Sequence, residues 1–77
     1  MKKAEMQILK ALKEFTSLTF AKMSEKTGLH RIVCEKRCKE GPLRQYLTIK
    51  PYATRGDTDS VVCLNPEGEK FAVELGL

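Results

Sequence analysis

The chain has 77 residues, of which 42% are hydrophobic and 31% charged, and its formal net charge is +4. This length suffices for one small domain and leaves no room for a catalytic domain beside a regulatory one. The composition argues against disorder, and no apolar run approaches the roughly 18 residues of a membrane span. Because residues 1–5 also lack the apolar core of a signal peptide, we expect a single cytoplasmic domain over residues 1–77, without membrane association.

The positive charge is concentrated in the first 45 residues. Residues 30–45 carry a net charge of +3, whereas residues 46–65 are balanced and residues 66–77 carry −2. A localised basic patch is what neutralisation of nucleic-acid phosphates requires. The alternative is a solvated helix face, since Lys and Arg also keep small domains soluble.

Apolar residues at helical spacing predict a first helix over residues 4–15. Its inward-facing residues are expected to be Ala4, Ile8, Ala11, Leu12 and Phe15. Residues 16–19 are rich in N-cap types and precede a short second helix over residues 20–26. We expect Phe20, Ala21 and Met23 to face inward there, and Gly28 to end this segment.

A third helix is predicted from about His30 to Glu40, ending at Gly41-Pro42. Its apolar pattern is mixed, but cysteine is readily buried and a pair four residues apart forms one seam. We therefore expect the inward residues to be Val33, Cys34 and Cys38. The outward residues are then Arg31, Ile32, Glu35, Lys36 and Lys39.

After Leu43 the apolar period changes from helical spacing to alternation, which predicts strands around residues 46–50 and 61–64. Residues 51–59 between them contain Pro, Gly and Asp, so a β-hairpin with an exposed tip is expected. Asn65, Pro66 and Glu67 then predict the start of a last helix. Its apolar face is expected to carry Phe71, Ala72 and Leu75.

This order of elements resembles a winged helix-turn-helix domain. Residues 18–29 resemble the first helix and turn of a helix-turn-helix, and residues 61–71 resemble a wing strand that leads into a closing helix. The strand followed by Leu64-Asn65-Pro66-Glu67-Gly68 is similar to small winged-helix transcription regulators of bacteria, archaea and their viruses. The resemblance implies an α+β fold, with three helices followed by a β-hairpin wing and a short C-terminal helix.

The resemblance further implies sequence-specific binding of double-stranded DNA by a small transcriptional regulator, with the third helix in the major groove. Arg31 is the expected base reader, because its guanidinium suits a bidentate contact to guanine. The full set of expected DNA-binding residues is Thr19, Lys22, Arg31, Glu35, Lys36, Arg37, Lys39, Lys50 and Arg55. Asp57 and Asp59 on the hairpin tip would repel phosphate and limit the wing's contribution.

A homodimer is compatible with this mode, because such readers usually bind two half-sites; a monomer is equally compatible. The dimer interface would come from the face with Ile8, Leu12 and Phe15 or from the closing helix.

Two other functions stay open. A winged helix also serves as a protein–protein interaction module without DNA binding. A metal- or redox-responsive repressor would use His30, Cys34, Cys38 and Cys63, although we favour these cysteines as small core hydrophobes. We expect no enzymatic activity and no cofactor, because the chain shows neither a Gly-rich phosphate loop nor paired carboxylates beyond scattered surface residues.

Overall fold

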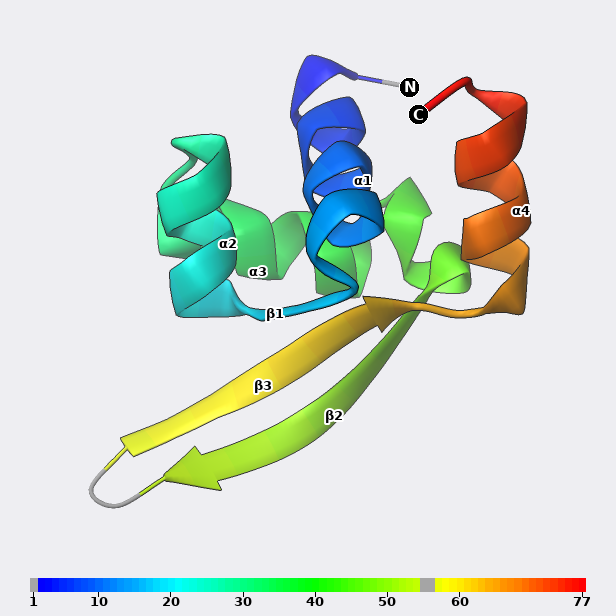
Figure 1. The fold of residues 1–77 in the computed structure, drawn as a ribbon. Helices are drawn as coiled ribbons and strands as arrows, with labels where there is room; N and C mark the ends of the chain where they lie inside the picture. Colours follow the sequence, from blue (N-terminus) through cyan, green and yellow to red (C-terminus); the bar gives the residue numbers. More distant parts are fainter. Residues whose placement is uncertain (1, 55–56) are drawn as a thin grey trace.

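The computed structural model describes residues 2–54 and 57–77, with the backbone alone described over 52–54 and 57–59. The elements in chain order are α1 (Lys3–Phe15), β1 (Ser17–Thr19), α2 (Phe20–Thr27), α3 (Arg31–Glu40), the 3-10 helix η1 (Pro42–Tyr46), β2 (Leu47–Thr54), β3 (Asp57–Leu64) and α4 (Pro66–Glu74). Figure 1 shows α1 between α2 and α4, with the hairpin of β2 and β3 below them and reaching away on the side of α2. The expected α+β class, three helices followed by a hairpin and a closing helix, is confirmed.

The core forms where α1, α2, α3 and the base of the sheet meet. Its fully buried side chains include Ile8, Leu9, Phe20, Met23 and Val62. These residues come from three elements, α1, α2 and β3, and each helix buries only one apolar stripe. Helix α2 ends at Gly28, whose φ of 76° lies in the left-handed region that glycine adopts without strain.

The three strands form an antiparallel sheet in the order β1-β3-β2. Strand β1 was not predicted, because three residues with one inward-facing Leu18 give no alternation to detect. Leu18 lies opposite Val62 in β3, and Ile49 of β2 lies opposite the same Val62 on the other side. The central strand β3 therefore fixes both neighbours to the core.

The hairpin strands are longer than predicted. They run to Thr54 and start again at Asp57, so the expected turn over residues 51–59 is wrong in extent. Pro51 fits within β2 because β2 is an edge strand, where a missing N–H costs little. Arg55 and Gly56, which join the strands, lie outside the described residues.

Helix α4 begins as predicted. The Asn65 side chain accepts a hydrogen bond from the Gly68 N–H at 2.7 Å and donates one to the Gln45 carbonyl at 2.9 Å. Gly68 is buried against η1, where a Cβ would overlap the carbonyl oxygen of Tyr46. The Phe71 ring stacks on the Tyr46 ring with centroids 4.4 Å apart. The start of α4 is therefore fixed by η1, a short helix that was not predicted; its last residue, Tyr46, was expected in a strand.

Several predicted orientations are wrong. Phe15 is 41% exposed, because it is the last residue of α1, and the ammonium of Lys26 covers its ring at 4.9 Å. Ala21 is exposed on the outer side of α2. Val33 is 37% exposed, because the single seam of α3 is already filled by the two cysteines. Leu75 is also exposed, since it lies past the last turn of α4.

The prediction that this face of α1 forms a dimer interface is wrong as well. Ile8 and Leu12 are buried within the core of this chain and have no surface to offer a second copy.

Candidate nucleic-acid interface

Helix α3 is anchored to the core by a pair of cysteines one turn apart. Cys34 and Cys38 are both fully buried, as predicted, and the Cys38 thiol lies 3.9 Å from the Met23 sulfur. His30 caps the helix, because its Nδ1 accepts a hydrogen bond from the Ile32 N–H at 3.1 Å. The cap and the buried seam together determine which side of α3 faces outward.

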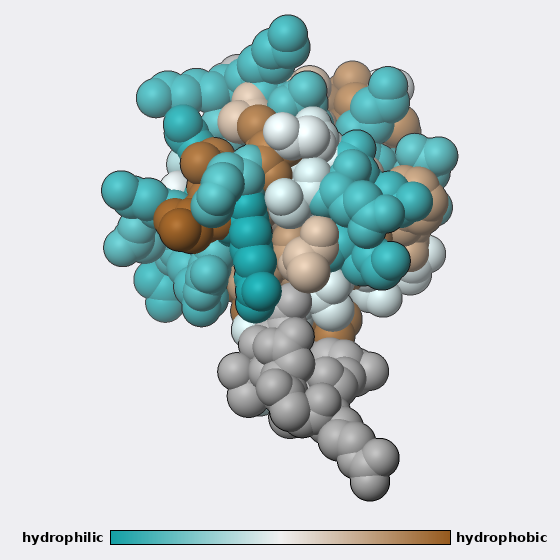
Figure 2. All heavy atoms as spheres, turned by 90° about the vertical axis from the view of Figure 1, so that its left-hand side faces the viewer, coloured by the Kyte–Doolittle hydropathy of each residue, from teal (hydrophilic) through white to brown (hydrophobic). Residues whose placement is uncertain are grey.

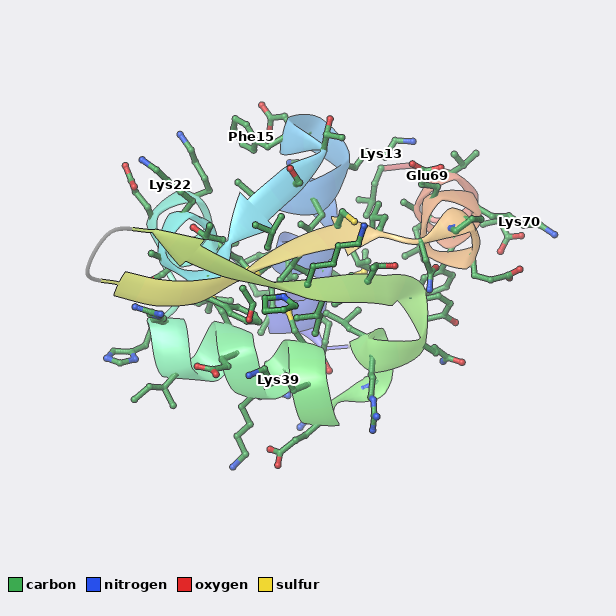
Figure 3. All side chains as sticks on the ribbon, turned by 90° about the horizontal axis from the view of Figure 1, so that it is seen from below. Lys13, Phe15, Lys22, Lys39, Glu69 and Lys70 are labelled. Atoms are coloured by element: carbon green, nitrogen blue, oxygen red, sulfur yellow. The ribbon has the colours of Figure 1, made fainter. Side chains whose placement is uncertain are left out.

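The outward side of α3 is basic. Residues four and seven positions apart share one helix face, so Ile32, Lys36 and Lys39 form a stripe opposite the buried cysteines. Arg31 is exposed at the N-terminal end of the same helix. The ammonium of Lys39 donates to the Glu35 carboxylate at 2.8 Å. In the view from below, α3 runs alongside the hairpin (Figure 3).

The cysteines of α3 behave as core residues. Burial raises the pKa of the Cys34 thiol, and burial together with the neighbouring Cys34 raises the pKa of Cys38 to about 12. Such thiols stay protonated and are poor nucleophiles and metal ligands. His30 is exposed at the N-cap of α3, where its Nδ1 accepts the Ile32 N–H. Among residues 2–51 and 60–77, whose side chains the structure describes, no group of three or more His, Cys, Asp or Glu side chains is placed to hold a metal ion.

Arg37 has a structural partner that was not predicted from the sequence. Its Nη1 lies 3.7 Å from Oε1 of Glu5 on α1, a carboxylate that is only 2% exposed. The second oxygen of Glu5 is buried without a hydrogen-bond partner. Arg37 itself is 34% exposed in its side chain. This ion pair joins the start of α1 to the last half of α3, so Arg37 contributes to the position of that helix.

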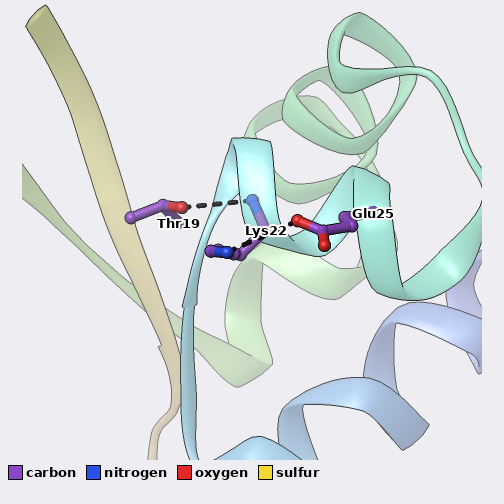
Figure 4. A network of polar contacts seen from close by, with 3 residues as sticks. All are labelled: Thr19, Lys22 and Glu25. Carbon is purple, nitrogen blue, oxygen red and sulfur yellow. Dashed lines mark hydrogen bonds and ion pairs between the residues drawn. The ribbon is translucent and has the colours of Figure 1, made fainter.

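The residues proposed on α2 are held by local contacts (Figure 4). The Thr19 hydroxyl accepts a hydrogen bond from the Lys22 N–H at 3.2 Å and caps the helix. The Lys22 ammonium lies 3.5 Å from the Glu25 carboxylate, and both side chains are largely exposed. An exposed pair of this kind contributes little to stability, so Lys22 is free to exchange Glu25 for another anion.

The hairpin provides the remaining predicted residues. Lys50 is exposed on β2 and pairs with Val61 across the ladder. Arg55 lies outside the described residues, and only the backbone is described for Asp57 and Asp59. Figure 2 shows the side of the molecule with α2 and α3, which is mostly hydrophilic with scattered hydrophobic areas. Within α2 and α3, the exposed large hydrophobic side chains are Ile32 and Val33.

Comparison with known proteins shows a similar fold in a solved structure but no matching sequence family. Neither a protein-family model nor a curated protein matches this sequence. The fold is similar to that of BpsR from Bordetella bronchiseptica, whose DNA binding is regulated by 6-hydroxynicotinic acid. The superposition has a TM-score of 0.78 at 17% identity and covers 97% of this chain and 52% of that chain. The two chains share a fold, and this chain spans about half the length of BpsR.

No helix over the described ranges is both long and apolar enough to cross a membrane.

Proposed function

We propose that this chain is a winged helix-turn-helix transcription regulator that binds double-stranded DNA with α3 in the major groove and the β2–β3 hairpin as a wing. The observation that carries the proposal is the basic outer face of α3. This face points outward because Cys34 and Cys38, on the opposite side of the helix, are buried in the core. A major groove about 12 Å wide admits one helix, and exposed cations on that helix neutralise the phosphates on either side. The likeness to a DNA-binding regulator supports the same function.

Each predicted residue has a role in this proposal. Arg31, at the N-terminal end of α3, reads a base edge, while Lys36 and Lys39 contact phosphates. Lys39 would exchange the Glu35 carboxylate for a phosphate, which leaves Glu35 facing the groove. Thr19 and Lys22 approach the backbone from α2, and Lys50 and Arg55 do so from the wing. Arg37 is assigned to positioning α3 through Glu5 rather than to a phosphate contact.

The proposal includes one winged-helix domain over residues 1–77 and a cytoplasmic location, where bacterial and archaeal DNA is found. A homodimer stays a prediction. The competing function is a protein–protein module whose basic face is only solvated, and it predicts no affinity for DNA.

Fluorescence anisotropy with a random-sequence duplex of about 20 base pairs, roughly two helical turns, tests the proposal. With phosphate contacts from the five cations assigned to the backbone, affinity should fall about 500-fold between about 50 and 200 mM salt. These cations are Lys22, Lys36, Lys39, Lys50 and Arg55. Lys36→Ala should reduce the salt slope by about 1, whereas Lys70→Ala on the distant helix α4 should leave it unchanged. Absence of binding at about 50 mM salt would refute DNA binding and favour the protein–protein module.

A further inference from the structure

An exposed isoleucine lies on the basic outer face of α3. The Ile32 side chain is 67% exposed and does not belong to the hydrophobic core cluster. Arg31 precedes it, and Lys36 and Lys39 follow it one and two turns later on the same face. From Ile32 to Lys39 the helix rises about 10 Å, so the stripe spans about three base pairs.

The setting of Ile32 differs from that of exposed hydrophobic residues outside α3. The Phe15 ring is covered by the Lys26 ammonium, and Val73 on α4 has charged neighbours of both signs along the helix, Glu69, Lys70 and Glu74. Single exposed hydrophobic residues are common and need no function by themselves. Ile32, however, has Arg31 beside it and Lys36 one turn later, and charged residues are depleted at the centre of protein–protein interfaces. A polyanion with an apolar group at its surface suits this face better than an apolar protein surface does.

We propose that Ile32 contacts the C5-methyl group of thymine and gives the protein a preference for thymine in its binding site. The inference rests on the proposed function, because it requires α3 in the major groove. The thymine methyl is the apolar group that the bases present in that groove, and aliphatic or aromatic side chains recognise it by contact. The cations around Ile32 hold the helix against the phosphates, while the isoleucine itself has no polar group to satisfy.

The inference is tested with two duplexes of about 20 base pairs, roughly two helical turns. One is an alternating dA-dT duplex, and the other has deoxyuridine in place of every thymidine, so they differ only in the C5-methyl groups. Alternation places a methyl group within reach in any register. Affinities are measured by fluorescence anisotropy for the wild type, Ile32→Ser and the control Val73→Ser, whose native residue is similarly exposed at 64%.

The wild type and Val73→Ser should bind the thymine duplex about three- to fivefold more tightly, the effect of burying one methyl group. Ile32→Ser should bind both duplexes equally. Equal affinities in the wild type, with salt-dependent binding intact, would overturn the inference and leave the proposed function standing. A preference that survives in Ile32→Ser would also overturn it, because another residue would then read the methyl group. Absence of binding to these duplexes and to random-sequence DNA would refute the proposed function and the inference together.

Discussion

The ion pair between Glu5 and Arg37 gives the sharpest prediction about α3. Arg37→Ala removes the cation and leaves the Glu5 carboxylate buried, at 2% exposure, with neither oxygen paired. Breaking a buried pair in this way costs about 3–5 kcal/mol. Because Arg37 is 34% exposed and the pair is 3.7 Å apart, we expect a loss at or below the lower end of that range, about 2–3 kcal/mol. For a chain of this length the midpoint of thermal unfolding should fall by about 10–20 °C.

Glu5→Gln keeps the shape of the side chain and removes the buried charge, so it should cost much less than Arg37→Ala. In the double variant the charge that makes Arg37→Ala costly is already absent. The two changes should therefore be less than additive, with a coupling of about 1–2 kcal/mol measured by urea unfolding of all four proteins. Additivity within about 0.5 kcal/mol would refute the argument.

The Arg37→Ala variant also distinguishes a positioning role of Arg37 from a direct phosphate contact. Measured well below its unfolding temperature, Arg37→Ala should keep the salt slope of DNA binding. A slope reduced by about 1 would instead identify Arg37 as a direct phosphate contact.

The remaining predictions concern the closing helix and the buried thiols. Gly68→Ala should destabilise the protein by about 2–4 kcal/mol, because the new Cβ overlaps the backbone carbonyl of Tyr46, which cannot rotate away; a change below about 0.5 kcal/mol in urea unfolding would contradict this packing. Cys38, with a pKa raised to about 12, should resist alkylation at pH 8 until the chain unfolds; rapid labelling of the native protein would show that α3 is not seated as described. The folded state retains the Cys38 proton when the unfolded chain has lost it, so the free energy of unfolding should fall as pH rises above about 9, by up to about 1.4 kcal/mol per unit. Cys38→Ala should show a shallower decline over the same range, and identical slopes would contradict the assignment.

The parts of the fold that could be predicted are those that depend on neighbouring residues. Asn65-Pro66 marks the start of α4 because capping is a local interaction, and Gly28 ends α2 for a similar reason. Cys34 and Cys38 were placed correctly because a spacing of four residues defines one side of a helix.

The parts that could not be predicted depend on contacts between distant segments. Glu5 has the polarity of a surface residue, and its contact with Arg37 depends on how α1 and α3 pack. Strand β1 exists because Leu18 meets Val62, more than forty residues later in the chain. At the candidate interface, the sign of the charge on α3 could be predicted from the sequence. The division between Arg37, which faces an internal partner, and Lys36, which is exposed, required the packing of α3.

Thr19 has two structural roles, one in the sheet and one at the start of α2. It is the last residue of β1, paired with Val61 of β3, and its hydroxyl caps the first turn of α2 through the Lys22 N–H. Beyond this point the hairpin continues as a two-stranded ribbon without a third strand. Thr19 therefore lies at the boundary between the three-stranded part of the sheet and this ribbon. A change in the length of the ribbon beyond Val61 would therefore leave both the pairing of β1 with β3 and the cap of α2 in place.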